Sequence, residues 1–202
     1  MTIKYEKGTV DDADSIVSMQ QELNKLLDLQ ELDEEQFKKY ILTDIQSEDR
    51  SYFVAKTNGE TIGVISVDFS ESISVNDVDD YNASITLMFV DERYRNGTIA
   101  FDLFKLAIDE IQKNGENSFV MSVEDNNPNK YLHFAFADVL IEENEEQTKN
   151  GTTSQYLLGV TDIDKVKSYT FKEIMKKSVK MKKEFSEVLK TIPRAETIAY
   201  LF

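Results

Sequence analysis

The fold is decided by residues 84–104, which read SITLMFVDERYRNGTIAFDLF. Residues 84–90 form an apolar run rich in β-branched and aromatic side chains, with the length of a buried strand. From residue 99 onward the apolar side chains cover more than one stripe of a helical pattern, which implies burial against a sheet. Between the two lie Arg93, Arg95 and Gly97. The stretch therefore predicts a strand that passes through a short cationic loop directly into a helix.

Such a junction is typical of an anion site. A strand that enters a helix through a short loop points backbone N–H groups and the positive end of the helix dipole at one place. Pyrophosphate is a natural occupant of that place. Arg93 and Arg95 add positive charge at its rim, and Gly97 permits a tight backbone path that a side chain would obstruct. Junctions of this kind are also common without a ligand, so the stretch alone leaves a purely structural role open.

Hydrophobic periodicity predicts the elements that precede this stretch. They are a strand over residues 2–7, helices over 9–27 and 33–46, a hairpin over 51–69, and a loop or ragged strand end over 70–82. The hairpin is indicated by Asn58-Gly59 between two β-branched and aromatic runs. Gly63, inside the second run, indicates a bulge.

The elements that follow alternate between helix and strand. They are a helix over residues 99–115, a strand over 118–123, a helix over 127–141, a polar loop over 142–151 and a strand over 153–160. The sequence thus predicts an α/β (α+β) fold with a mixed central sheet of about six to seven strands, flanked by helices. The first 160 residues are expected to form one domain.

Residues 161–202 are expected to form a helical extension of different composition. This segment holds ten basic and six acidic residues, whereas the whole chain has a net charge of −15. Apolar side chains from Ile174 to Ile192 follow a spacing close to a heptad, which predicts a long C-terminal helix that Pro193 stops. This seam packs either on the body of its own chain or on a second copy in a homodimer. The closing residues 196–202 are expected to add an edge strand.

Composition narrows the function classes. With 38 acidic and 23 basic residues, the chain lacks the excess of Lys and Arg that nucleic-acid phosphates require. The acidic excess is compatible with a cationic substrate, a basic protein partner or solubility alone. The absence of cysteine excludes disulfides, thiolate metal sites and a Cys nucleophile. No apolar segment approaches the roughly 20 residues of a membrane helix, and no signal peptide is apparent, so a cytoplasmic protein without metal is expected.

The loop after residue 90 resembles the acetyl-CoA pyrophosphate loop of the GNAT superfamily of N-acetyltransferases. That pattern is Arg or Gln, two residues, Gly, one residue, then Gly or Ala, and the segment Arg95-Asn96-Gly97-Thr98-Ile99-Ala100 matches it at Arg95 and Ala100. Thr98 stands at the first glycine position. The runs TVDDADSI and FVAKTNGETIGVISV resemble the opening strand-to-helix signature and the second and third strands of the same family. The element order fits from residue 2 to about 160.

The resemblance implies a site for acetyl-CoA as acyl donor. Its pyrophosphate would lie on the loop from Arg95 to Ala100, and backbone N–H groups near Phe89 and Val90 would polarise the acetyl carbonyl. After the fifth strand the family has an Asn followed seven residues later by a Tyr, which protonates the leaving thiolate. Here these positions are Asn127 and Phe134, and Phe134 has no hydroxyl group.

Two residues are therefore candidates for the acid–base chemistry. Glu124, beside Asp125 at the end of the fifth strand, is the candidate base, since a neighbouring carboxylate raises a carboxyl pKa toward the useful range. His133 is the candidate acid because its reference pKa lies near 6.5, although it should point about 100° away from Phe134 on the helix. Tyr131 supplies a hydroxyl only if the register shifts by one turn.

Two functions remain open at this stage. The first is an acetyl-CoA-dependent N-acetyltransferase that transfers an acetyl group to a small-molecule or protein amine. Transfer would be direct, in a ternary complex, because there is no Cys for a covalent intermediate. The second is a catalytically degenerate protein of the same fold, in which the acidic surface or the helical tail binds a protein partner.

Overall fold

The structure, a computed structural model, describes residues 2–31, 33–47, 49–70, 72–75, 79–95, 97–127, 129–148 and 150–192. The segment 196–202, for which an edge strand was expected, lies outside these residues. In the described part of the chain, no helix is both long enough and apolar enough to span a bilayer.

The first third of the chain has the predicted elements. They are β1 (Lys4–Lys7), the 3-10 turn η1 (Val10–Asp12), α1 (Ala13–Leu26), α2 (Glu34–Gln46), β2 (Arg50–Thr57) and β3 (Glu60–Asp68). Asn58 and Gly59 join β2 to β3 with φ angles of 51° and 83°, the left-handed conformation that a tight hairpin turn requires. The β2–β3 register shifts at Ile62, directly before Gly63, which confirms the predicted bulge.

Residues 84–104 form the predicted strand, loop and helix, but the segment that precedes them differs from the prediction. β6 (Ser84–Val90) leads through the 3-10 turn η2 (Glu92–Tyr94) into α3 (Ile99–Lys113). The acidic segment expected as a loop contains a small hairpin of its own, β4 (Ile73–Val75) and β5 (Asp79–Tyr81). These strands pair with each other and not with the main sheet.

The segment after β7 (Phe119–Glu124) corrects two expectations. α4 (Lys130–Phe136) is shorter than the helix expected up to residue 141, because the backbone N–H of Asp138 already donates to Gly159 of β9 (Gly151–Val160). The polar stretch expected as a loop is instead most of β8 (Val139–Thr148). β8 is the edge strand beside β9, where polar side chains remain in water.

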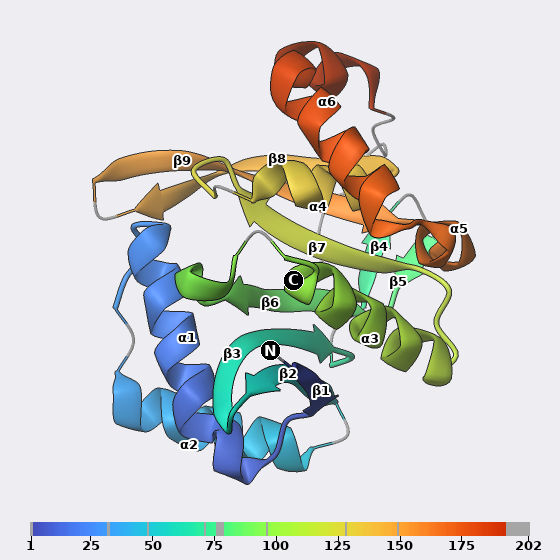
Figure 1. Cartoon of the computed structure of the whole chain (residues 1–202). Helices are drawn as coiled ribbons and strands as arrows, with labels where there is room; N and C mark the ends of the chain where they lie inside the picture. Colours follow the sequence, from blue (N-terminus) through green and yellow to red (C-terminus); the bar gives the residue numbers. More distant parts are fainter. Residues whose placement is uncertain are drawn as a thin grey trace.

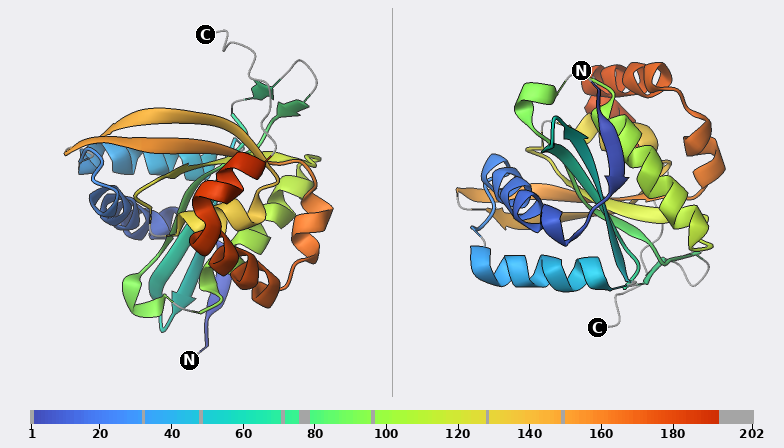
Figure 2. Two further views of the ribbon diagram at one scale, coloured as in Figure 1. Left: turned by 90° about the horizontal axis from the view of Figure 1, so that it is seen from above. Right: turned by 60° about the horizontal axis from the view of Figure 1, so that its bottom comes forward.

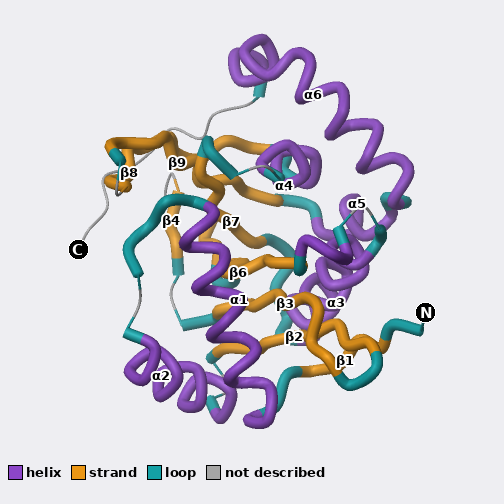
Figure 3. The backbone as a smooth tube through the Cα atoms, turned by 60° about the vertical axis from the view of Figure 1, so that its left-hand side comes forward, coloured by secondary structure: helices purple, strands orange, loops and turns teal. Residues whose placement is uncertain are grey.

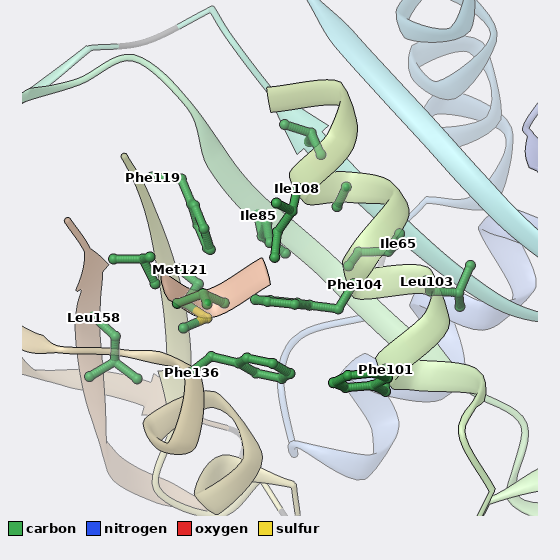
Figure 4. Close-up of a cluster of buried hydrophobic side chains, with 14 of the residues drawn as sticks. Ile65, Ile85, Phe101, Leu103, Phe104, Ile108, Phe119, Met121, Phe136 and Leu158 are labelled. Carbon is green, nitrogen blue, oxygen red and sulfur yellow. The ribbon is translucent and has the colours of Figure 1, made fainter. Parts of the chain in front are cut away.

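The seven main strands form one mixed sheet in the order β1-β2-β3-β6-β7-β9-β8, with helices on both faces (Figures 1 and 3). α1 and α2 cover one face through a core cluster that includes Ile16, Ile41 and Leu87. α3 and α4 cover the other face (Figure 2). There Phe104 stacks on Phe136 with ring centroids 3.8 Å apart (Figure 4). This aromatic contact joins α3 to α4.

β6 and β7 run parallel and then part. Their register contains only Ser84 with Val120 and Ile85 with Met121. Directly afterwards the register between β3 and β6 shifts past Thr86, so that β6 carries one extra residue at that point. A bulge bends its strand and increases the local twist. From there to Val90, β6 has no register partner in β7, and the sheet opens between the two strands.

The C-terminal segment packs on its own chain. It forms α5 (Ile163–Ser168) and α6 (Phe171–Thr191), with non-helical backbone angles at Glu184, in place of one uninterrupted helix. α6 lies along α4 (Figure 1). Ile174 is fully buried, and the Phe185 ring meets Phe134 edge-on with centroids 5.0 Å apart. Of the two arrangements considered for the apolar seam of this helix, the part from Ile174 to Phe185 therefore shows the first, packing on the body of its own chain.

The burial of Ile174 gives a test of this packing. Ile174→Ala should lower the free energy of unfolding by about 2 to 4 kcal/mol, because it removes buried methyl groups and leaves a cavity. Val179→Ala on the same helix should change it by less than about 0.5 kcal/mol, since Val179 is 51% exposed. Urea unfolding measures both values. Equal effects would contradict the packing of α6 on the body.

Candidate functional site

Two hollows lie on either side of the opening between β6 and β7. The first is a cleft of about 430 Å³ between the loop that precedes α3, the helix α4 and the helix α6. The second is a pocket of about 340 Å³ between α1, β6, β7 and α4. Met88 of β6 lines both. The two hollows therefore adjoin at the place where the sheet opens, and we call them the α3 cleft and the α1 pocket.

The first turn of α3 faces the α3 cleft with no side-chain cap. Thr98 occupies the N-cap position, but its hydroxyl donates to Asp102 at 2.6 Å and makes no capping bond. The Tyr5 hydroxyl donates to the same carboxylate at 2.8 Å. Ile99 and Ala100 line the cleft at the start of the helix. Unsatisfied N–H groups and the helix dipole make such a terminus a binding place for an anion.

The two arginines of the loop differ in what they contact. Arg93 is paired with Asp91 and Glu60, and these carboxylates raise its pKa above its ordinary value. Arg95 donates from Nε to the backbone oxygen of Val90 at 2.8 Å and lies over the Phe89 ring at 5.1 Å. It forms no ion pair with any residue that the structure describes, and it lines the α3 cleft. Of the two arginines, only Arg95 thus brings to the cleft a charge that has no ion pair with a described carboxylate.

Gly97 leaves room at the mouth of the same cleft. A Cβ atom placed on Gly97 would meet no protein atom within 4 Å. The glycine is therefore not required for packing inside the protein. Space beside an uncapped helix terminus and an unpaired guanidinium is what a phosphate group needs in order to approach the backbone.

The residues that were predicted to bind the cofactor lie in different parts of the structure. Those that line the α3 cleft are Val90, Arg95, Gly97, Ile99 and Ala100. Asn96 lies outside the described residues. Phe89 is buried beneath Arg95, and Thr98 points to Asp102. Asn127 lines the α1 pocket, and Phe134 is fully buried against Tyr156 and Phe185.

Three groups that the sequence did not assign to the cofactor line the α3 cleft. Met88 precedes the two residues proposed on β6, and among the described residues it alone lines both hollows. Tyr131, which the sequence offered only with a shift of one turn, lines the cleft as well. Five residues of α6 complete the lining: Phe171, Met175, Ser178, Val179 and Lys182. A contact between segments about 80 residues apart has no local sequence signal.

The α1 pocket combines one carboxylate with neutral polar groups. Glu124, at the end of β7, is half-buried and is the only acidic side chain among the described residues that line this pocket. Gln20 and Asn24 of α1 approach from the other side, where the Gln20 amide donates to Asn24 Oδ1 at 2.8 Å. His133 of α4 also lines the pocket. Both candidate acid–base residues therefore lie in one hollow, next to the opening of the sheet.

Two hydrogen bonds hold the C-terminal end of α1, beside this pocket, to segments that are distant in the sequence. The Asn126 side chain donates to the backbone oxygen of Leu27 at 2.7 Å. The backbone N–H of Asn150, at the tip of the β8–β9 hairpin, donates to Asp28 at 3.0 Å. In Figure 2 this hairpin reaches over to α1. The end of α1 is thus held against both strand segments that border the pocket.

His133 is held as a neutral imidazole. Its side chain is 6% exposed, and Nδ1 lies 3.2 Å from the backbone oxygen of Asn129. Burial lowers the pKa of His133 from 6.5 to about 4. With that pKa the ring is uncharged at neutral pH, so it does not suit the role of the expected acid, and it is a weaker base than an ordinary histidine.

The lowered pKa of His133 predicts a pH dependence of stability. The unfolded chain takes up a proton near pH 6.5, and the folded chain does so only near pH 4. The free energy of unfolding should therefore fall as the pH drops from about 6.5 toward 4, by up to about 3 kcal/mol. Since His133 is the only histidine, its ring-proton NMR signals report the pKa directly. Titration near pH 6.5 in the folded protein would contradict the burial.

No metal site emerges from the described residues, which contain no group of three His, Cys, Asp or Glu side chains able to hold an ion.

Comparison with protein families gives one match. Residues 16–135 match the model of the acetyltransferase (GNAT) family, more than half of the chain. This span includes α1, the opening of the sheet, the loop before α3 and most of α4. No curated protein matches the sequence.

Solved structures share the fold at low sequence identity. An N-acetyltransferase from Staphylococcus aureus Mu50 aligns with a TM-score of 0.64 and 15% identity, over 81% of this chain and 99% of that one. YncA of Salmonella typhimurium, solved with its cofactor acetyl-CoA, gives 0.62 and 14%, over 80% and 95%. PaiA N-acetyltransferase from Thermoplasma acidophilum, in complex with coenzyme A, gives 0.55 and 17%, over 77% and 98%.

Proposed function

Since the chain belongs to the acetyltransferase (GNAT) family, we propose that it transfers an acetyl group from acetyl-CoA to an amine by direct attack, with both substrates bound together. One observation carries this proposal: the cleft that contains Arg95 and the pocket that contains Glu124 adjoin at Met88, where β6 and β7 part. A donor held in the one and an acceptor held in the other would meet in the opening. Positioning of this kind supplies several kcal/mol toward the barrier.

The residues of the α3 cleft fit the donor. Arg95 and the uncapped first turn of α3 would hold its pyrophosphate, and Gly97 leaves the space for it. The apolar side chains of Val90 and Met88 extend the cleft from there to the opening. The bound donor supplies an acetyl thioester whose carbonyl carbon is open to attack by an amine. Backbone N–H groups of β6 that have no partner in β7 suit the developing negative charge on the carbonyl oxygen.

The α1 pocket fits the acceptor amine. Within the part of the pocket that the structure describes, Glu124 is the only lining carboxylate, so it would attract an ammonium group and take its proton, directly or through a water molecule. His133, neutral at pH 7, is the second group in the pocket able to accept that proton. Tyr131 lines the α3 cleft, and we assign to its hydroxyl the protonation of the leaving thiolate, since Phe134 has no hydroxyl.

Binding of acetyl-CoA is the first test. Arg95→Ala should weaken the affinity measured by calorimetry at least about tenfold, because a charge-assisted phosphate contact contributes roughly 1.5 to 3 kcal/mol. Arg93→Ala is the matched control: it removes the same charge from the same loop, but from a residue that Asp91 and Glu60 already pair, so its effect should stay below about twofold. An absence of binding to the wild-type protein at millimolar acetyl-CoA would refute the enzyme and favour a partner-binding role.

Glu124 is tested by kinetics with an amine identified from an acceptor panel. Glu124→Gln keeps the shape of the side chain but removes the base, so kcat should fall by about 10²-fold or more. The affinity for acetyl-CoA should stay unchanged, since Glu124 does not line the α3 cleft. Asp125→Asn is the control on the neighbouring carboxylate, which already pairs with Lys130 at 2.5 Å. Equal activity of Glu124→Gln and the wild type would move the role of base to His133.

A further inference from the structure

We infer that α6 is part of the donor-binding site, and that Lys182 is a second phosphate-binding cation of the α3 cleft. This inference rests on the proposed function, since it names residues that would hold the same donor. It goes beyond that function because α6 lies outside the region that the family model matches, which ends at residue 135.

The position of α6 is the first support. Five residues of this helix line the α3 cleft. Its first residue, Phe171, meets Phe101 of α3 edge-on with centroids 5.7 Å apart. Further along, Phe185 meets Tyr131 of α4 with centroids 5.2 Å apart. α6 is therefore fixed to both helices that border the cleft, and the side chains between these two contacts are held over it.

Charge is the second support. The chain has a large acidic excess, yet no Asp or Glu is among the described residues that line the α3 cleft. The lining contains two cations, Arg95 from the loop before α3 and Lys182 from α6. Neither forms an ion pair with a residue that the structure describes, whereas Arg93, a few residues away, binds two carboxylates. The cleft is thus a local positive site that suits a ligand with several negative charges.

Exposed apolar side chains are the third support. Met175 is 39% exposed and Val179 is 51% exposed, although both are large apolar residues. Both line the α3 cleft beside the uncharged Ser178 and beside Lys182. An apolar wall with a cation at one end matches a ligand that has an extended neutral arm and a phosphate group. Coenzyme A has this chemistry, and we commit to it as the occupant.

The test compares two lysines of the same helix. Lys182→Glu reverses the charge inside the cleft, and Lys180→Glu makes the same change on an exposed residue that does not line it. Affinity for acetyl-CoA is measured by calorimetry for both variants and for the wild type, at one low salt concentration because exposed charges are screened. Lys182→Glu should weaken binding about tenfold, and Lys180→Glu less than twofold. Thermal unfolding should be the same for all three, since both side chains are exposed.

The other outcomes overturn the inference. If both variants bind acetyl-CoA equally well, α6 takes no specific part in binding. If Lys182→Glu binds more tightly than the wild type, α6 obstructs the cleft and does not complete it. These results are separate from a failure of the proposed function, which would appear as absent binding to the wild type. The Arg95→Ala variant, measured in parallel, confirms that the observed binding takes place in the α3 cleft.

Discussion

The structure depends on the parting of β6 and β7. Two register pairs hold these strands together, Ser84 with Val120 and Ile85 with Met121, and the bulge at Thr86 then turns β6 away. Backbone groups left without a partner strand are costly when buried, so an open sheet of this kind needs water or a ligand in the gap. The gap also joins the two hollows at Met88. The donor site, the acceptor site and the meeting point that we propose therefore all depend on one irregularity in one strand.

The second constraint is electrostatic. The chain has a net charge of −15, and Arg93 in the loop before α3 is paired with two carboxylates, Asp91 and Glu60. Arg95 of the same loop differs, because its guanidinium lies over Phe89 and donates to the backbone of Val90. The result is a cationic cleft on an acidic protein. The carboxylate Glu124 lines the other hollow, so under the proposed function a polyanionic donor and a cationic acceptor would each be drawn to a different hollow.

Local patterns in the sequence predicted most of the fold. The hairpin at Asn58-Gly59, the bulge near Gly63 and the strand-to-helix passage into α3 each rest on residues close together in the chain. β8 was missed because an edge strand has one side in water and can be as polar as a loop. In the site, a loop motif identified Arg95, Gly97 and Ala100, which line the α3 cleft. Phe134 does not line that cleft, because its ring packs against Phe185, a residue far away in the sequence. The lining by α6 likewise arises from tertiary packing alone, for which the sequence carries no local signal.

The central claim is that one opening in the sheet joins a donor cleft to an acceptor pocket. A crystal structure of the protein with coenzyme A tests it most directly. The account predicts that the pyrophosphate lies on the first turn of α3 beside Arg95 and that the thiol reaches Met88 between β6 and β7. Coenzyme A bound elsewhere on the surface, or bound with its thiol directed away from the α1 pocket, would contradict the claim.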